Sequence, residues 1–373
     1  MNTTIDHQGV DDGVPSEMQT MIADSVERLF AKQVTRELLE RFDAGHRADA
    51  LWQMVVDNGL PGALVPEGAG GSGANWLDAS PVLRAIGYWQ APLPLAETML
   101  AAALLAHAGM EVPEGPITLI QAGRLGDLQL DKEGARLDGQ VVNVPWARTC
   151  RWAVVADGQH LALVDLRQAT ITLAAGSNFA DEERDALVFA NASTQATGQL
   201  QLAGLHEPVW HLGALVRACM LVGTLEAVVD KAVMYANERV QFGKPIGKQQ
   251  VLQQYLAQMA GATGTARMAV QVALRSASDL FLKTAGSSNT LAFDIAVAKV
   301  CAGEAATLAA SVAHQVHGAI GFTHEHTLHF ATRRLWSWRD EFGSDAHWAK
   351  VLGQAAIAAG SEGFWAGLTD RSL

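Results

Sequence analysis

The stretch NERVQFGKPIGKQQ, residues 237–250, interrupts a helical pattern that continues on both sides of it. Before it, positions of one helix face recur at Leu221, Leu225, Val228, Ala232 and Tyr235. After it, they recur at Leu252, Tyr255, Met259, Thr263, Ala266 and Val270. Because this spacing places side chains on one face of a helix, the stretch predicts a corner between two long helices.

A third helical pattern follows further along the chain. Its face positions are Leu291, Ile295, Ala298, Ala302, Ala305, Ala309, Val312 and Val316, preceded by cap candidates between Ser287 and Thr290. Three long helices joined by short connections predict an antiparallel bundle over residues 206–373.

The spacing of the apolar residues changes upstream of the bundle. Short β-branched runs such as RLDGQVVNVPWA (136–147) predict a small antiparallel β domain over residues 113–205, with a hairpin turn at Asp157-Gly158. Residues 1–112 return to helical spacing and predict an N-terminal helical domain. The expected fold class is therefore α+β and mainly α, in the order helical, β, helical.

Composition excludes several classes of protein. The chain has 373 residues, 49% of them hydrophobic, and 27 Lys+Arg against 39 Asp+Glu give a net charge of −12. A disordered chain is excluded by this hydrophobicity, and nucleic-acid binding is disfavoured by the negative charge. Cys150, Cys219 and Cys301 read as reduced, packed thiols. With no signal peptide and no transmembrane segment recognised, a cytoplasmic location is expected.

Two motifs have simple structural explanations. GAGGSG, residues 68–73, matches a dinucleotide fingerprint, but without a βαβ context it predicts a loop between helices. The histidines between His314 and His329 have spacings that suit a metal, yet only Glu325 is an acidic neighbour. We therefore expect no metal site.

Two segments carry more specific chemistry, NERVQFGKPIGKQQ (237–250) and HQVHGAIGFTHEHTLH (314–329). Arg239 at the corner offers a planar donor fork for a phosphate, and Gly318 with Gly321 allows a backbone to pass close to a ligand. Alternatively, Arg239 pairs with a carboxylate and the glycines only end a helix. Residue chemistry alone leaves both interpretations open.

These segments closely resemble the C-terminal signature regions of the acyl-CoA dehydrogenase family, flavoenzymes that introduce an α,β double bond into acyl-CoA thioesters. The resemblance extends to residues 51–73 and 92–98 of the N-terminal part and to RLDGQVVNVPWA. GAIGFTHEHTLH and VQFGKPIG look most like the branch of heteromeric dehydrogenases of bacterial steroid and bile-acid side-chain degradation.

The resemblance implies a set of residues that contact FAD. Arg239, Gln241 and Phe242 fall on positions that contact the dinucleotide held by a neighbouring subunit, and Gln250 falls near the adenine. Gln315, Gly318 and Ala319 match the segment that lies against the pyrophosphate, with Ala319 replacing a glycine.

Other parts of the family pattern are missing. The Thr-Glu-Pro…Gly-Ser-Asp stretch and the Trp-Ile-Thr-like strand, which hold the isoalloxazine ring, have no counterpart here. The usual base positions hold Phe342 in the loop 342–344 and Gly213-Ala214 on the first bundle helix. Asp340 and Glu341 would serve as a base only after a shift of the alignment, so the catalytic residue is left unassigned.

The resemblance therefore predicts a subunit of a heteromeric, FAD-dependent acyl-CoA dehydrogenase. A homologous partner subunit in a heterotetramer would supply the ring pocket and the base, and an electron-transfer flavoprotein or similar acceptor would take the electrons. One alternative is a self-sufficient homo-oligomeric dehydrogenase that uses Glu341 or another base. A second alternative is a non-catalytic scaffold that binds neither flavin nor CoA.

Overall fold

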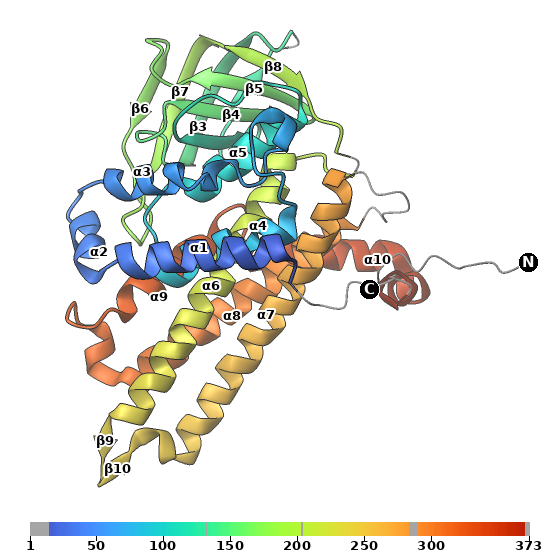
Figure 1. Ribbon diagram of the computed structural model, residues 1–373. Coiled ribbons are helices and arrows are strands. Elements are labelled where there is room, and N and C mark those ends of the chain that lie inside the picture. The colour runs from blue at the N-terminus through green and yellow to red at the C-terminus, as the bar shows by residue number, and fades with distance from the viewer. Residues whose placement is uncertain (1–14, 132, 203, 283–289, 370–373) are drawn as a thin grey trace, which may run out of the picture.

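The computed structural model describes residues 15–131, 133–202, 204–282 and 290–369. An N-terminal group of helices lies between a pair of β-sheets at one end and a bundle of long helices at the other (Figure 1). The order of elements is helical, β, helical, and it confirms the predicted fold class.

The described residues of the N-terminal part, from Pro15 on, form five α-helices. They are α1 (Glu17–Gln33), α2 (Arg36–Asp43), α3 (Asp49–Asp57), α4 (Trp76–Trp89) and α5 (Leu95–His107), with short 3-10 turns η1 (Leu60–Gly62) and η2 (Glu67–Ala69). The side chains of Ser16, Thr35 and Asn75 cap α1, α2 and α4 by accepting hydrogen bonds from backbone N–H groups. The glycine-rich segment 68–73 runs from η2 toward α4, which confirms the predicted loop between helices.

The β part is made of two four-stranded sheets. One has the strand order β1 (Ile117–Gln121), β4 (Trp152–Asp157), β5 (His160–Asp165), β8 (Ala196–Gln199). The other has the order β2 (Gln129–Leu130), β3 (Arg136–Pro145), β7 (Arg184–Ser193), β6 (Ile171–Ala174). Apolar side chains from both sheets, among them Leu137, Val155 and Phe189, form a common core.

The predicted antiparallel pairing holds with one exception. Strands β4 and β5 form the predicted hairpin, with Asp157 opposite His160. Strands β1 and β4, however, are parallel, with Ile117 opposite Trp152. The chain passes through β2 and β3 of the other sheet between these two strands, so β4 returns beside β1 in the same direction. Such a crossover leaves no local signal in the sequence.

The C-terminal part contains the predicted long helices. They are α6 (Pro208–Glu238), α7 (Gln250–Leu282) and α8 (Leu291–His317), followed by η4 (Gly318–Phe322), α9 (Leu328–Asp340) and α10 (Asp345–Thr369). The corner between α6 and α7 holds β9 (Val240–Gln241), β10 (Lys244–Pro245) and η3 (Ile246–Lys248). Thr290 is the N-cap of α8, whereas the candidates at 287–289 lie outside the described residues.

Helices α4 and α6 cross at a very short distance. A Cβ atom added to Gly223 would lie 1.9 Å from the carbonyl oxygen of Arg84, and one added to Gly87 would lie 1.9 Å from that of Met220. Only glycine fits at these two positions, because any side chain would overlap the facing backbone. This crossing fixes α6 against the N-terminal helices.

Two helical segments, 208–238 and 291–322, are long and apolar enough to cross a membrane by length and composition alone. In the most apolar window of each, 89% and 61% of the residues, respectively, are buried inside the protein. The apolar side chains of these helices are thus used in the protein core.

Candidate functional site

The corner between α6 and α7 presents an arginine and an aromatic ring to solvent. Arg239 caps α6, and within the described part of the chain its guanidinium makes no ion pair. Phe242 has a left-handed backbone with φ of 51° and is 94% exposed. Gln241 and Gln250 are also exposed at this corner. Among the residues that the structure describes, Arg239 is therefore not paired with a carboxylate of its own chain.

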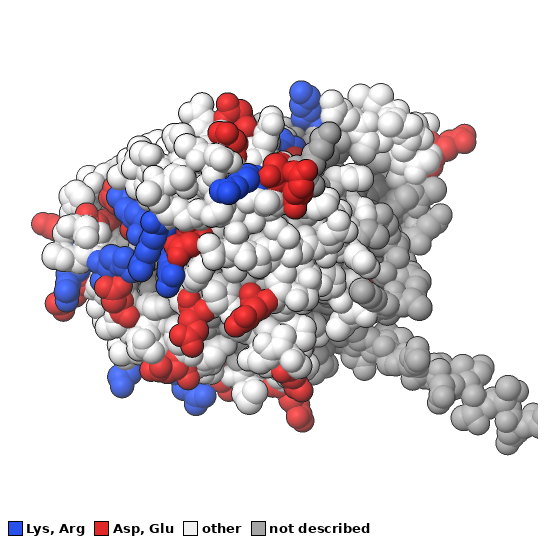
Figure 2. Space-filling model, turned by 90° about the horizontal axis from the view of Figure 1, so that it is seen from above, with Lys and Arg blue, Asp and Glu red and all other residues white. Residues whose placement is uncertain are grey.

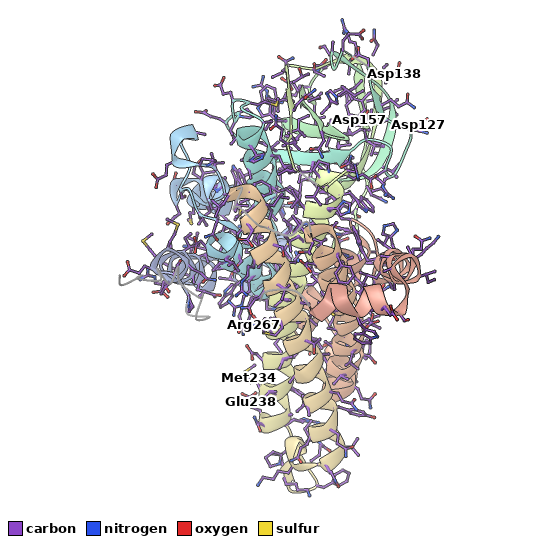
Figure 3. The ribbon with its side chains drawn as sticks, turned by 90° about the vertical axis from the view of Figure 1, so that its right-hand side faces the viewer. Asp127, Asp138, Asp157, Met234, Glu238 and Arg267 are labelled. Atoms are coloured by element: carbon purple, nitrogen blue, oxygen red, sulfur yellow. The ribbon has the colours of Figure 1, made fainter. Side chains whose placement is uncertain are left out.

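This corner lies far from the β-sheets of its own chain. Figure 3 places Met234 and Glu238 near one end of the bundle, whereas Asp127, Asp138 and Asp157 lie at the opposite end of the molecule. The side chains of Arg239 and Phe242 follow Glu238 directly. Both side chains are exposed and are therefore accessible to another molecule.

The second signature segment ends α8. Gln315, Gly318 and Ala319 are exposed, and Gly318 has φ of 62° with open space where a Cβ would be. Tyr235, one turn before Arg239, stacks on His317 with ring centroids 4.5 Å apart. Two helix ends that are far apart in sequence thus meet through this stack, although Arg239 itself contacts neither Gln315 nor Gly318 among the contacts described.

The histidines of this segment pack against other rings. His314 stacks on Phe322 with centroids 4.4 Å apart, and His317 meets His326 at 4.6 Å. Burial lowers the pKa of His326 to about 4, so this ring is neutral at physiological pH. Within the described ranges, no group of three or more His, Cys, Asp or Glu is arranged to hold a metal ion.

A cavity of about 380 Å³ lies between the sheets and α9. Its walls include Val141–Pro145 of β3, Trp336 and Ser337 of α9, and the pair Glu341-Phe342 that follows α9. The walls are mostly apolar, and the indole Nε1 of Trp210 is buried there without a hydrogen-bond partner. A ligand in this cavity would therefore meet an unsatisfied donor.

Glu341 is held at the base of this cavity by two arginines. Its carboxylate accepts hydrogen bonds from Arg184 Nε at 2.7 Å, Arg217 Nε at 2.6 Å and Asn178 Nδ2 at 3.0 Å. Burial alone would raise the pKa of Glu341, but the two guanidinium groups outweigh burial and lower it to about 2. A carboxylate held in this way is a poor proton acceptor, because protonation would cost both ion pairs.

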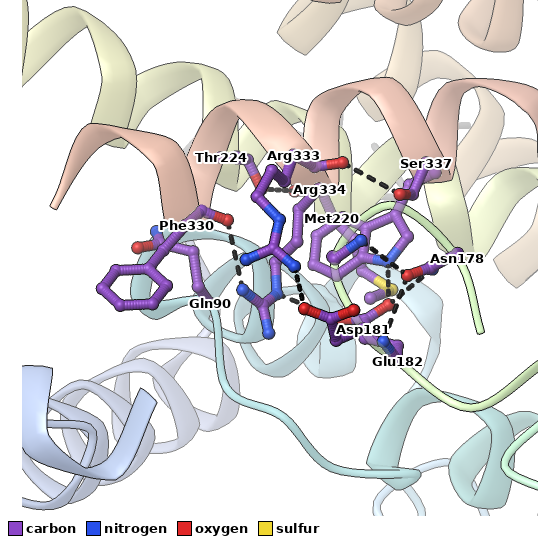
Figure 4. A network of polar contacts seen from close by, with 12 residues as sticks. Gln90, Asn178, Asp181, Glu182, Met220, Thr224, Phe330, Arg333, Arg334 and Ser337 are labelled. Atoms are coloured by element: carbon purple, nitrogen blue, oxygen red, sulfur yellow. Dashed lines mark hydrogen bonds and ion pairs between the residues drawn. The ribbon is translucent and has the colours of Figure 1, made fainter. Parts of the chain in front are cut away.

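The ion pairs of Glu341 continue in both directions through the interior. Arg217 also pairs with Glu97 of α5, and Arg184 also pairs with Glu182 at 3.1 Å. Glu182 in turn accepts from Arg334 Nε of α9 at 3.0 Å and from Trp338 Nε1 at 2.8 Å. Figure 4 shows the Glu182 end of this network. We call the resulting series of three acids and three arginines the buried ion chain: Glu97, Arg217, Glu341, Arg184, Glu182, Arg334.

The two base positions named by the family resemblance meet in space. The ring of Phe342 lies against Gly213, where an added Cβ would be 2.5 Å from a ring carbon. Phe342 has φ of 53°, so its backbone is left-handed, and the glycine leaves room for its ring. Neither position bears an acid. The other carboxylate of the cavity wall, Asp340, is 58% exposed and accepts from Arg339 at 3.2 Å.

Lys299 fixes the segment that carries Glu341 and Phe342. This lysine is fully buried in α8, and its Nζ donates to the carbonyl oxygens of Trp338, Arg339 and Gly343. Burial lowers the pKa of Lys299 to about 7. The lysine thus satisfies the carbonyl groups at the end of α9, and it holds the following turn against α8.

Sequence reasoning missed most of the buried ion chain. A signal was present, because Glu97 and Arg217 are charged residues inside otherwise apolar helical stretches. Buried charges are rare unless they are paired. The sequence does not say which residues pair, since the six partners come from four stretches that are far apart in the chain.

Two family models match this chain. The model "Acyl-CoA dehydrogenase, N-terminal domain" matches residues 16–112, and "Acyl-CoA dehydrogenase, C-terminal domain" matches residues 210–353. The two matches lie on the two helical parts of the fold, on either side of the sheets.

Known proteins resemble the chain over most of its length. Acyl-CoA dehydrogenase IpdE2 of Mycolicibacterium smegmatis is 28% identical over 85% of this chain and 90% of its own length. The ChsE4-ChsE5 complex from Mycobacterium tuberculosis superposes with a TM-score of 0.81 at 22% identity, covering 93% of this chain and 99% of that one. A "Tcur3481-Tcur3483 steroid ACAD" variant superposes with a TM-score of 0.77 at 20% identity, covering 92% and 99%.

Proposed function

Because this chain belongs to the acyl-CoA dehydrogenase family, we propose that it is one subunit of a heteromeric, FAD-dependent enzyme. The family consists of oxidoreductases that act on acyl-CoA, and its solved neighbours are FAD-dependent flavoproteins. In this proposal the chain binds the dinucleotide half of an FAD whose isoalloxazine ring lies in a homologous partner subunit. The partner also supplies the catalytic base.

One observation carries the proposal. The corner with Arg239 and Phe242 is exposed at the end of the bundle remote from the cavity, while Glu341 inside the cavity is committed to Arg184 and Arg217. The residues suited to a cofactor therefore face another molecule, and the position suited to a base holds Phe342. A chain of this kind needs a second subunit to complete a reaction centre.

The residues of the corner and of the α8 end fit the dinucleotide half of FAD. The Arg239 guanidinium has no partner among the described residues and suits a phosphate, and the exposed backbone at Gly318 allows close approach of a pyrophosphate. Gln241, Phe242, Gln250, Gln315 and Ala319 surround these two points on the surface.

The cavity walls from β1 and β3 fit a flavin ring poorly. Of the wall residues on β3, only Asn143 carries a side-chain hydrogen-bonding group, whereas Val141, Val142, Val144 and Pro145 carry none, and the proline also lacks an N–H. The side-chain amide of Gln121 already donates to the Ala156 carbonyl and accepts from the backbone N–H of Trp210. These walls support the assignment of the ring to the partner.

When bound, FAD supplies a hydride acceptor, and the reaction also needs a carboxylate that removes the α proton of the thioester. Glu341 does not meet this need at neutral pH, because two arginines hold its charge. The partner therefore provides the base. The substrate class is an acyl-CoA thioester, and the steroid dehydrogenase among the structural neighbours favours a CoA ester of a steroid side chain. An electron-transfer flavoprotein or similar acceptor would reoxidise the flavin.

The first prediction concerns flavin content. The full chain expressed alone is expected to carry little FAD, whereas its complex with the partner carries fewer than one FAD per chain, because only one of two sites is complete. Flavin absorbance against protein mass in both samples tests this. A yellow homo-oligomer with one FAD per chain would show that the chain is self-sufficient.

The second prediction concerns Arg239. A charge-assisted hydrogen bond contributes roughly 1.5–3 kcal/mol, so Arg239→Ala is expected to weaken FAD binding by the complex about 10- to 100-fold. Arg136→Ala, an exposed arginine on β3, serves as the control and should leave FAD affinity unchanged. Equal FAD affinity for the two variants, with assembly intact, would remove Arg239 from the site.

A further inference from the structure

A second cleft, of about 580 Å³, lies on the side of the β part that faces α2 and α3. Phe42, Trp52 and Trp146 form its aromatic walls, and Leu93 with the prolines beside it closes one edge. None of these residues belongs to the FAD corner or to the cavity beside Glu341. The cleft is thus separate from the site assigned above.

Four arginines line this cleft: Arg47, Arg148, Arg151 and Arg167. The acids in the same lining are Asp49, Glu114 and Glu183, so the lining is net positive in a chain of net charge −12. In the view from above the sheets, Lys and Arg side chains gather on the side that carries α2, α3 and β6 in Figure 1 (Figure 2). This distribution favours an anionic ligand.

Two of these arginines, Arg148 and Arg151, pair with carboxylates that lie outside the cleft lining. Arg148 Nε lies 3.1 Å from Asp185, which is fully buried, and Arg151 Nε lies 3.1 Å from Asp165. Arg47 pairs at 3.1 Å with Asp49, which is an exposed acid of the same lining. The side chain of Arg167 makes no ion pair in the part of the chain that is described. Each guanidinium keeps further N–H donors for a ligand, in the planar arrangement that suits phosphate.

Glu183, the acid nearest the floor, lies 3.7 Å from Arg148 Nε and is otherwise bound to Thr149. Glu183 accepts hydrogen bonds from the backbone N–H of Thr149 at 3.1 Å and from its hydroxyl at 2.9 Å. The floor itself is a tight turn, in which the Trp146 carbonyl accepts from the N–H groups of Thr149 and Cys150. Trp146 is 4% exposed, so its ring is a fixed wall. The cleft is therefore formed before any ligand arrives.

The geometry points to a nucleoside phosphate as the ligand of this cleft. A flat base would stack on the partly exposed rings of Phe42 and Trp52, and its phosphates would meet the guanidinium groups of Arg151 and Arg167 at the open side. Neither inorganic phosphate nor a bare nucleoside has both parts. This site does not depend on the heteromeric assembly proposed above, because all its residues belong to one chain.

ADP is the probe for this site. The titration uses the full chain carrying Arg239→Ala, which removes the FAD corner as a second binder, and isothermal calorimetry measures the affinity. ADP is expected to bind at one site per chain, more tightly than either pyrophosphate or adenosine. No saturable ADP binding, or pyrophosphate binding as tightly as ADP, would overturn the inference.

Arg151→Gln/Arg167→Gln in the same background is expected to weaken ADP binding at least about 10-fold, because charge-assisted bonds to phosphate are lost. Both side chains are largely exposed, so the variant should fold, and its urea midpoint checks this. Arg136→Gln is the matched control with ADP affinity unchanged. Equal affinity in both variants would also overturn the inference. The ADP affinity of the chain does not depend on whether the complex binds FAD, so a failure of the proposed function would not change this result.

Discussion

Glu341→Gln is expected to lower the free energy of unfolding by roughly 3–5 kcal/mol, the usual effect of breaking a buried ion pair from one side. Glutamine keeps the size of the side chain but leaves Arg184 and Arg217, which are 3% and 1% exposed, without their common counter-charge. The urea midpoint of the full chain measures this loss. A general base, in contrast, would lose roughly 10²–10⁴ in rate with little change in stability.

A matched control and a pH series separate these two roles. Glu40→Gln breaks the exposed pair with Arg36, in which both side chains are 49% exposed, and should change stability by less than about 0.5 kcal/mol. Because the folded pKa of Glu341 is about 2 and its ordinary value is 4.5, its contribution is present above pH 4.5 and is lost as pH falls toward 2. In the Glu341→Gln variant, the free energy of unfolding should lack this acid-dependent contribution. Unchanged stability with lost turnover would make Glu341 the base.

Arg217→Met is expected to destabilise the fold at least as much as Glu341→Gln. It should lower the free energy of unfolding by roughly 3–5 kcal/mol or more. This variant removes the arginine between Glu97 and Glu341 and leaves Glu97, whose side chain is 2% exposed, with no opposite charge. Burial of an unpaired carboxylate is costly because water can no longer solvate it. The urea midpoint, or the yield of soluble chain where the variant fails to fold, measures the effect.

Replacing both partners should recover most of the free energy of unfolding that Arg217→Met loses. Glu97→Met/Arg217→Met removes one acid and one arginine, and the remaining residues of the buried ion chain stay balanced: Glu341, Arg184, Glu182, Arg334. Apolar replacement of a whole buried pair is often neutral in stability. A double variant as unstable as Arg217→Met would mean that the charge of Glu97 is not the reason for the loss.

The buried ion chain occupies the place where the family resemblance puts the base. Glu97 comes from α5 of the N-terminal part, Arg184 from β7 of the β part, and Arg217 and Glu341 from the C-terminal part, so the buried ion chain joins all three parts of the fold. Phe342 fills the remaining space against Gly213. The position thus holds a network of buried ion pairs, and in the proposed heteromer the exposed corner at Arg239 would be the part that meets the partner subunit.

The sequence by itself determined the order of the three parts and the corner at 237–250. Helical and strand periods are local, since each depends on neighbouring residues of one element, so they can be read along the chain. The same locality explains the hairpin at Asp157-Gly158 and the loop at 68–73. The parallel pairing of β1 with β4 escaped this approach, because it depends on a crossover between sheets.

Only the tertiary structure decided what Glu341 does. The sequence left it as a candidate base, because a carboxylate beside the expected loop position has the right chemistry for proton transfer. Its role depends on Arg184 and Arg217, which lie 157 and 124 positions away in sequence. Which charges meet in a protein interior follows from how helices and sheets pack, and the energy of an ion pair depends on that distance and burial. The sequence shows which charged residues are present. The packing of helices and sheets decides which of these charges are paired and which are available for a reaction.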